Sequence, residues 1–170
     1  MATAQTVEVA VQRDGERVII DVNAQVQVAR TVAWAVLTDY EHMADFVDDL
    51  KSSVVLSREG NKLQVEQSGV FKRAFLTFAF STVRSIELFP EREVRSHLVR
   101  GDFKYYDVVT RLAGGPAGPT TITHHGEYVP RRWVPPMLGP SLIEAETRKQ
   151  YTELLTEMER RAAARQAPSK

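Results

Sequence analysis

The stretch "WAVLTDYEHMADFVDDL" (residues 34–50) decides the expected fold, because it interrupts a chain that otherwise alternates like a series of strands. Its apolar start continues from Val32 as a short helix that stops at Thr38-Asp39. A second short helix is expected from Tyr40 to Phe46, since Thr38-x-x-Glu41 has the form of a capping box. Each helix is too short to be stable alone, so both must pack on a larger body.

Segments of alternating polar and apolar residues surround these helices and predict strands. Before the helices lie residues 7–12 and 17–28, which are separated by an Asp-Gly turn signal. After the helices, turn-forming residues separate six expected strands, at residues 52–58, 62–69, 75–88, 93–100, 103–112 and 120–129. Short connections of this kind favour an antiparallel meander.

The C-terminal part of the chain predicts one long helix over residues 141–164. Pro140 precedes Ser141, and Ser141-x-x-Glu144 is a second capping-box pattern. The second half of this helix carries an apolar stripe that would face the sheet. Traced back toward the helix start, the stripe meets three side chains of mixed character: Gln150, Thr147 and Ile143.

This order of elements predicts an α+β protein. We expect a curved antiparallel sheet of about seven strands, with two short helices after the first main strand and the long C-terminal helix over the concave face. The short helices would close one end of the groove between sheet and long helix. Residues 1–16 are expected to form a tail or an extra strand, and residues 165–170 a disordered tail.

Composition excludes several classes of function. Lysine plus arginine (22) equals aspartate plus glutamate (22), so the basic excess that is typical of a nucleic-acid-binding protein is absent. The chain has no cysteine, which excludes disulfides, thiolate metal sites and a cysteine nucleophile. Asp45, Asp48 and Asp49 lack the glycine and the spacing of a calcium loop. We expect neither a metal nor a cofactor.

The sequence favours a cytoplasmic protein. No apolar stretch approaches the roughly 18 residues that span a bilayer, and the N-terminus lacks the regions of a signal peptide. Ala2-Thr3-Ala4 nevertheless has the A-x-A form that signal-peptide cleavage leaves. An exported or periplasmic protein is therefore the alternative, if an upstream signal peptide has been removed.

The element order, together with "AWAVLTDYEHMADFVDDL" and with "WVPPMLGP" before the long helix, resembles the START-like (SRPBCC) superfamily. That superfamily has the helix-grip fold and includes polyketide cyclase/dehydrase-like proteins, coenzyme Q-binding proteins and lipid-transfer domains. The resemblance covers residues 17–162, and we assign a START-like domain to residues 17–164. It implies an elongated internal cavity for an apolar or amphipathic small molecule.

One end of the expected meander has the character of a cavity mouth. The connections "VDDLK", "GVFKRAF", "RGDFKYY" and "PRRWVPPML" fall at this end, and they interleave aromatic residues with lysine and arginine. Exposed apolar groups beside basic groups indicate a portal for an amphipathic ligand, or a surface that touches anionic lipid headgroups. The alternative is that the aromatic side chains fold inward as a plug and the basic groups are merely solvated.

Strand parity assigns a set of side chains to the concave face, where they would contact the ligand. A one-residue bulge would exchange the two faces of any strand. The candidate ligand-binding residues on the sheet are Gln67, Phe78, Phe80, Tyr106, Val108, Thr110, Ile122, His124 and Tyr128. Beyond the sheet, the candidates are Trp133, Ile143, Thr147 and Gln150.

Three of these residues are candidates for catalysis. His124 has a reference pKa near neutrality and could act as a general base or donate a hydrogen bond. Tyr106 and Tyr128 could orient a carbonyl or a hydroxyl group through their phenols. The alternative for all three is a structural role, since a buried histidine or tyrosine often only satisfies a neighbouring side chain.

Three functions are compatible with this pattern. The first is the binding or transport of a lipid, quinone or polyketide-like molecule, and we favour it over an enzyme. The second is an aromatase/cyclase of the polyketide cyclase/dehydrase type, in which the cavity folds a flexible substrate. The third is a surface for another protein or a membrane, although we expect no obligate protein partner.

Overall fold

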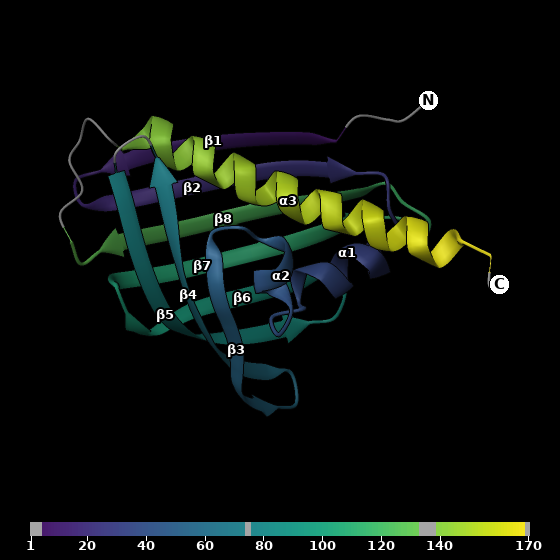
Figure 1. Ribbon diagram of the computed structural model, residues 1–170, viewed down its shortest axis with the longest axis horizontal. Helices are drawn as coiled ribbons and strands as arrows, with labels where there is room; N and C mark the ends of the chain where they lie inside the picture. The colour runs from purple at the N-terminus through teal and green to yellow at the C-terminus, as the bar shows by residue number, and fades with distance from the viewer. Residues whose placement is uncertain (1–4, 74–75, 133–138, 169–170) are drawn as a thin grey trace.

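The computed structural model describes residues 5–73, 76–132 and 139–168, and the chain folds as an antiparallel sheet grasping a long helix (Figure 1). The strands are β1 (Thr6–Asp14), β2 (Arg17–Val26), β3 (Leu50–Glu59), β4 (Lys62–Arg73), β5 (Leu76–Phe89), β6 (Glu93–Gly101), β7 (Phe103–Gly114) and β8 (Thr120–Pro130). The helices are α1 (Arg30–Leu37), α2 (Met43–Phe46) and α3 (Pro140–Gln166). The predicted α+β helix-grip architecture is confirmed.

All strands belong to one sheet with the order β1-β2-β8-β7-β6-β5-β4-β3, and every neighbouring pair is antiparallel. The meander from β3 to β8 is therefore as predicted. The sheet has eight strands rather than about seven, because residues 6–14 pair with β2 along their whole length. Val7, Val9 and Val11 of β1 are half-buried between exposed residues, so this strand covers one side of α3.

The two short helices form where they were predicted, but their boundaries differ from the capping-box pattern. Thr38 ends α1, and its hydroxyl donates a hydrogen bond of 2.8 Å to the Trp34 carbonyl instead of starting the next helix. α2 begins at Met43 after His42, without a side-chain cap. The Trp34 carbonyl also accepts the Thr38 backbone amide, so both groups of Thr38 close the last turn of α1.

The long helix also begins without the predicted cap. Pro140 is its first residue, Gly139 is the N-cap, and no side chain caps the amides, so Ser141 lies inside the helix. Proline is well suited to this first position because it has no amide hydrogen to satisfy. The helix continues to Gln166, two residues beyond the predicted end. None of the helices within the described ranges is long and apolar enough to cross a membrane.

The hydrophobic core fills one end of the grip, where α1, α2 and the second half of α3 meet the sheet (Figure 1). Val36 of α1, Ile122 of β8 and Leu155 of α3 are fully buried there. A second cluster of Tyr40, Leu63 and Ile86 continues this core toward β4 and β5. The short helices therefore close this end of the groove, as residues 34–50 predicted.

Gly69 of β4 lies at a point of close approach to Asp49 and Phe80. A β-carbon there would overlap the Asp49 carbonyl oxygen and would lie 2.6 Å from Cζ of Phe80. We expect Gly69→Ala to lower the free energy of unfolding by about 1–3 kcal/mol, as overpacking of a filled site does. Urea denaturation measures this change, and Gly115→Ala is the control because its β-carbon would have almost free space. Equal stability of both variants would contradict the close contact.

Candidate functional site

The concave face of the sheet divides into a closed half and an open half. In the closed half, Leu63, Ile86 and Leu112 are buried under the helices. In the open half, inward-facing side chains near the ends of the strands remain partly exposed: Phe78, Phe80, Leu98, Tyr106 and Tyr128. Large apolar side chains on the concave face are normally covered, so the open half is the place where a ligand would complete the packing.

Aromatic rings line the open half from two sides. On β4 and β5, Phe71 and Phe78 are stacked, with ring centroids 4.9 Å apart. On β7 and β8, Tyr106 and Tyr128 meet edge to face at 4.9 Å, and Phe103 packs against both of them. Rings of this kind provide apolar area with little loss of conformational freedom. An apolar ligand would lie against these rings.

Arg84 of β5 is a buried cation at the boundary between the two halves. Its side chain is on the concave face and the residue is only 9% exposed. Its guanidinium donates hydrogen bonds to the Tyr106 hydroxyl at 2.9 Å, to the Ser96 hydroxyl at 3.3 Å and to the Gln67 amide oxygen. All three partners are neutral, and Nε of Arg84 has no partner in the described part of the chain.

The sequence analysis missed Arg84, although the signal was present. Phe78 and Phe80 were assigned to the concave face, and residue 84 has the same parity on the same strand. An arginine at an inward position of a long strand is unusual, since arginine is almost never fully buried unless it is paired. Register confirms the shared face, because Arg84 lies opposite Val65 of β4 and Leu98 of β6.

His124 lies in the interior between two tyrosine hydroxyls. Its Nε2 is 2.9 Å from the Tyr128 hydroxyl on the same strand, and its Nδ1 is 2.9 Å from the Tyr151 hydroxyl on α3. The Thr110 hydroxyl is 3.4 Å from the same Nδ1. Burial lowers the pKa of His124 to about 4, so the imidazole is neutral near pH 7. His124 is thus half-buried and has a hydroxyl partner at each ring nitrogen.

The candidate residues on the sheet all lie on the concave face, but they divide between its two halves. Gln67 bonds Ser53 and Arg84 at the boundary. Ile122 is fully buried in the closed core, so contact between Ile122 and a ligand is not possible without unpacking that core. Val108 is also buried, at 5% exposure.

Of the candidate residues on α3, two are half-buried and one is exposed. Ile143 and Thr147 are half-buried, but Gln150 is exposed and does not face the groove. Consecutive helical residues point about 100° apart, and Tyr151 takes the inward position next to it. Trp133 lies outside the described residues.

Basic groups at the predicted mouth differ in their surroundings. The antiparallel order places the β4–β5 and β6–β7 connections and the end of β8 at one end of the sheet. There, Lys104 pairs with Glu16 at 3.1 Å, and Arg131 donates to the Gly101 carbonyl at 2.8 Å. Lys72 and Arg132 remain exposed. The basic rim for headgroups therefore stays a prediction.

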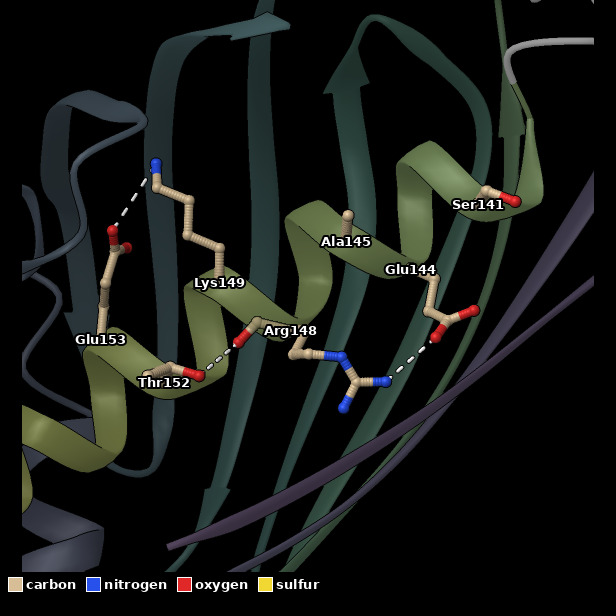
Figure 2. Close-up of a pocket in the computed structure, with 7 residues that line it drawn as sticks. All are labelled: Ser141, Glu144, Ala145, Arg148, Lys149, Thr152 and Glu153. Atoms are coloured by element: carbon tan, nitrogen blue, oxygen red, sulfur yellow. Dashed lines mark hydrogen bonds and ion pairs between the residues drawn. The ribbon is translucent and has the colours of Figure 1, made fainter.

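Open depressions also lie along the surface of the molecule. One of about 650 Å³ follows α3, and the charged side chains that line it pair with each other. Figure 2 shows the pairs Arg148–Glu144 and Lys149–Glu153 on successive turns of the helix. Within the described ranges, no group of three or more acidic or histidine side chains is placed to hold a metal ion.

The curved antiparallel sheet and the long helix that packs against it define a helix-grip fold. The sequence matches the family described as polyketide cyclase/dehydrase and lipid transport over residues 26–154, and the chain belongs to this family. No curated protein matches the chain significantly.

Solved structures with the same fold include both enzymes and lipid-transfer proteins. The aromatase/cyclase ZhuI from Streptomyces sp. R1128 has a TM-score of 0.74 and 16% sequence identity, over 89% of this chain and 99% of that one. A STAR-related lipid transfer protein from Xanthomonas axonopodis has a TM-score of 0.66 and 10% identity, over 89% and 98%. A START superfamily protein from Mycobacterium smegmatis has a TM-score of 0.62 and 13% identity, over 86% and 97%.

Proposed function

We propose that this protein binds and carries an amphipathic small molecule that has an apolar body and an anionic or strongly polarised oxygen group. The observation that supports this most directly is Arg84. A cation on the concave face, with only neutral partners among the described residues, costs free energy in the empty protein. A ligand oxygen that reaches the guanidinium would recover that cost.

The surroundings of Arg84 match both the apolar body and the oxygen group of such a ligand. The aromatic walls would remove the apolar body from water, at about 25 cal/mol per Å² of buried apolar surface. The guanidinium is a fork of donors that matches a carboxylate or a similar group. A few polar groups at one end of an apolar pocket are the usual means of fixing a ligand's orientation.

An aromatase/cyclase activity is the second candidate. His124 is neutral near pH 7 and is connected through Tyr128 to the open half of the groove, which is the arrangement that proton transfer would need. A cyclase should lose turnover in Tyr106→Phe or His124→Ala and keep its affinity for the substrate. A carrier should lose affinity only.

A pair of fluorescent probes tests the carrier proposal. 1-Anilinonaphthalene-8-sulfonate has an aromatic body and an anionic group, and N-phenyl-1-naphthylamine has nearly the same body without the charge. We expect the protein to bind both, and Arg84→Met to weaken the sulfonate probe by about tenfold or more, which corresponds to the loss of a charge-assisted hydrogen bond. The neutral probe should bind with unchanged affinity.

Two controls make this test specific. Arg100→Met removes an exposed arginine whose contact is a 3.6 Å pair with Glu66, and it should change neither affinity. Near-ultraviolet circular dichroism of each variant shows that packing is kept, since the sulfonate probe also binds partly unfolded protein. If the folded wild-type protein binds neither probe, the carrier proposal is wrong.

A further inference from the structure

Two tyrosine hydroxyls lie at the polar end of the open half, and each forms a hydrogen bond with a different side chain. Tyr106 of β7 contacts Arg84, and Tyr128 of β8 contacts His124. Their rings are 4.9 Å apart and both residues remain partly exposed. Within the described part of the chain, neither hydroxyl has a second hydrogen-bond partner. Whether each hydroxyl can donate a hydrogen bond to a ligand depends on whether it donates or accepts in its bond to Arg84 or His124.

For Tyr106 the direction is fixed by the chemistry of arginine. A guanidinium has only donors, so the bond of 2.9 Å from Nη1 of Arg84 ends on a lone pair of the Tyr106 oxygen. The hydrogen of the phenol takes no part in this bond. Tyr106 can therefore donate it to a ligand.

For Tyr128 the direction follows from the groups around His124. A neutral imidazole carries one hydrogen and one lone pair. Nδ1 faces two hydroxyls, those of Tyr151 and Thr110, while Nε2 faces only that of Tyr128. Nδ1 is the partner that both hydroxyls share, and its lone pair can accept a hydrogen from either of them, so we infer that Nδ1 is the acceptor. Nε2 then holds the hydrogen and donates it to the Tyr128 oxygen.

Gly126 makes the contact between His124 and Tyr128 possible. The three residues occupy successive concave-face positions of β8. A β-carbon at residue 126 would lie 2.6 Å from the ring carbons Cε2 and Cζ of Tyr128. Because glycine has no β-carbon, the Tyr128 ring can lie over residue 126, and its hydroxyl reaches the imidazole of His124.

We propose that Tyr106 and Tyr128 together form a two-donor receptor for a ligand oxygen that accepts hydrogen bonds, such as a carbonyl or an oxyanion. His124 and Tyr151 act as positioning residues, since they turn the Tyr128 hydrogen toward the ligand. This inference rests on the proposed binding function and narrows it: the ligand presents an acceptor at its polar end. A ligand whose polar group can only donate would find two donors facing it and would bind poorly.

A carbonyl probe tests the receptor directly. Prodan is a neutral naphthalene with a ketone, and its emission moves to longer wavelength when the ketone accepts hydrogen bonds. We expect Tyr128→Phe to weaken Prodan binding by about five- to tenfold and to shift the emission of the bound probe to shorter wavelength, as the loss of one hydrogen bond requires. N-Phenyl-1-naphthylamine has no carbonyl, and its affinity should not change.

The positioning role of His124 requires a second comparison. His124→Phe keeps a ring of similar shape, and we expect it to reproduce the Prodan loss and emission shift of Tyr128→Phe. The double variant should show no further loss, since both changes remove the same bond. His125→Phe is the matched control: this neighbouring histidine points to the convex face, where it bonds Asp21 at 2.6 Å. It should leave Prodan binding unchanged.

A measurement on the unaltered protein covers the case in which a variant fails to fold. The ¹⁵N chemical shifts of the His124 ring should show the hydrogen on Nε2. A hydrogen on Nδ1 would overturn the inference, because Tyr128 would then donate to the imidazole and offer only lone pairs to the ligand. Prodan binding that is insensitive to Tyr128→Phe would also overturn it. If the neutral naphthylamine still binds in that case, the carrier proposal stands; if neither probe binds the unaltered protein, both fail.

Discussion

Arg84→Met is expected to raise the free energy of unfolding of the ligand-free protein by about 1–4 kcal/mol. Replacing a buried charge by an apolar side chain of similar length often has this effect, because the desolvation cost of the charge disappears. Arg84 is suited to the exchange, since its bonds go to neutral groups and its Nε is unsatisfied. Gln67 keeps its bond to Ser53, and Tyr106 lies where water can reach it.

Urea denaturation of the empty protein at pH 7 measures this gain, and it should appear together with the loss of affinity for the sulfonate probe. A residue that costs stability and supplies affinity is the expected signature of a ligand-binding group. Arg100→Met, at an exposed position, should stay within about 0.5 kcal/mol of the unaltered protein. A loss of more than about 1 kcal/mol in Arg84→Met would mean that the guanidinium holds the sheet together and is not kept for a ligand.

Much of the fold could be predicted because the chain's patterns are local. Residues 34–50 interrupt a series of alternating segments, and period and turn residues were enough to place the meander and the long helix. The predicted helix starts were wrong because a capping-box pattern does not determine the backbone conformation at that position. At Thr38 the hydroxyl bonds backward to Trp34, and at residue 140 proline begins the helix without a side-chain cap.

The candidate site was harder to predict, because its chemistry depends on contacts between distant strands. Parity placed Tyr106, His124 and Tyr128 on the concave face correctly. It could not show that Tyr151 of α3 lies against His124, since this contact depends on the rotation and depth of the helix. Nor could parity separate Ile122, which is sealed in the core, from Tyr128 on the same face. The difference between the two halves is that α1 and α2 cover the closed half and leave the open half uncovered.

The free energy of unfolding is expected to fall in two steps as the pH is lowered from 6.5 to 2. The first step belongs to His124. Burial lowers its pKa in the folded protein to about 4, with His125 and Arg84 acting in the same direction and Asp21 against it. Between pH 6.5 and about 4, His124 is therefore protonated in the unfolded chain but not in the folded protein. Lowering the pH over this range decreases the free energy of unfolding by about 3 kcal/mol in total.

The main contribution to the second step comes from Glu157, a buried carboxylate on α3. Hydrogen bonds from Arg160 and, against some opposing effect of burial, from Arg161 lower the pKa of Glu157 to about 2. Because the folded pKa lies below the usual value of 4.5, the stabilisation is complete above pH 4.5 and is lost as the pH falls toward 2. Screening at the exposed Arg160 limits this step to about 1–2 kcal/mol.

Urea denaturation at a series of pH values separates the two groups. His124→Phe should remove the step between pH 6.5 and 4 and keep the lower one, whereas Glu157→Gln should keep the upper step and reduce the lower one. Asp39 and Glu93 also have lowered pKa values, so part of the lower step remains. His42 and His125 have raised pKa values, from their bonds to Asp39 and Asp21, so their contribution has the opposite sign and is lost as the pH rises. An upper step that survives in His124→Phe would mean that another group causes it and that the pKa of His124 is not lowered in the folded protein.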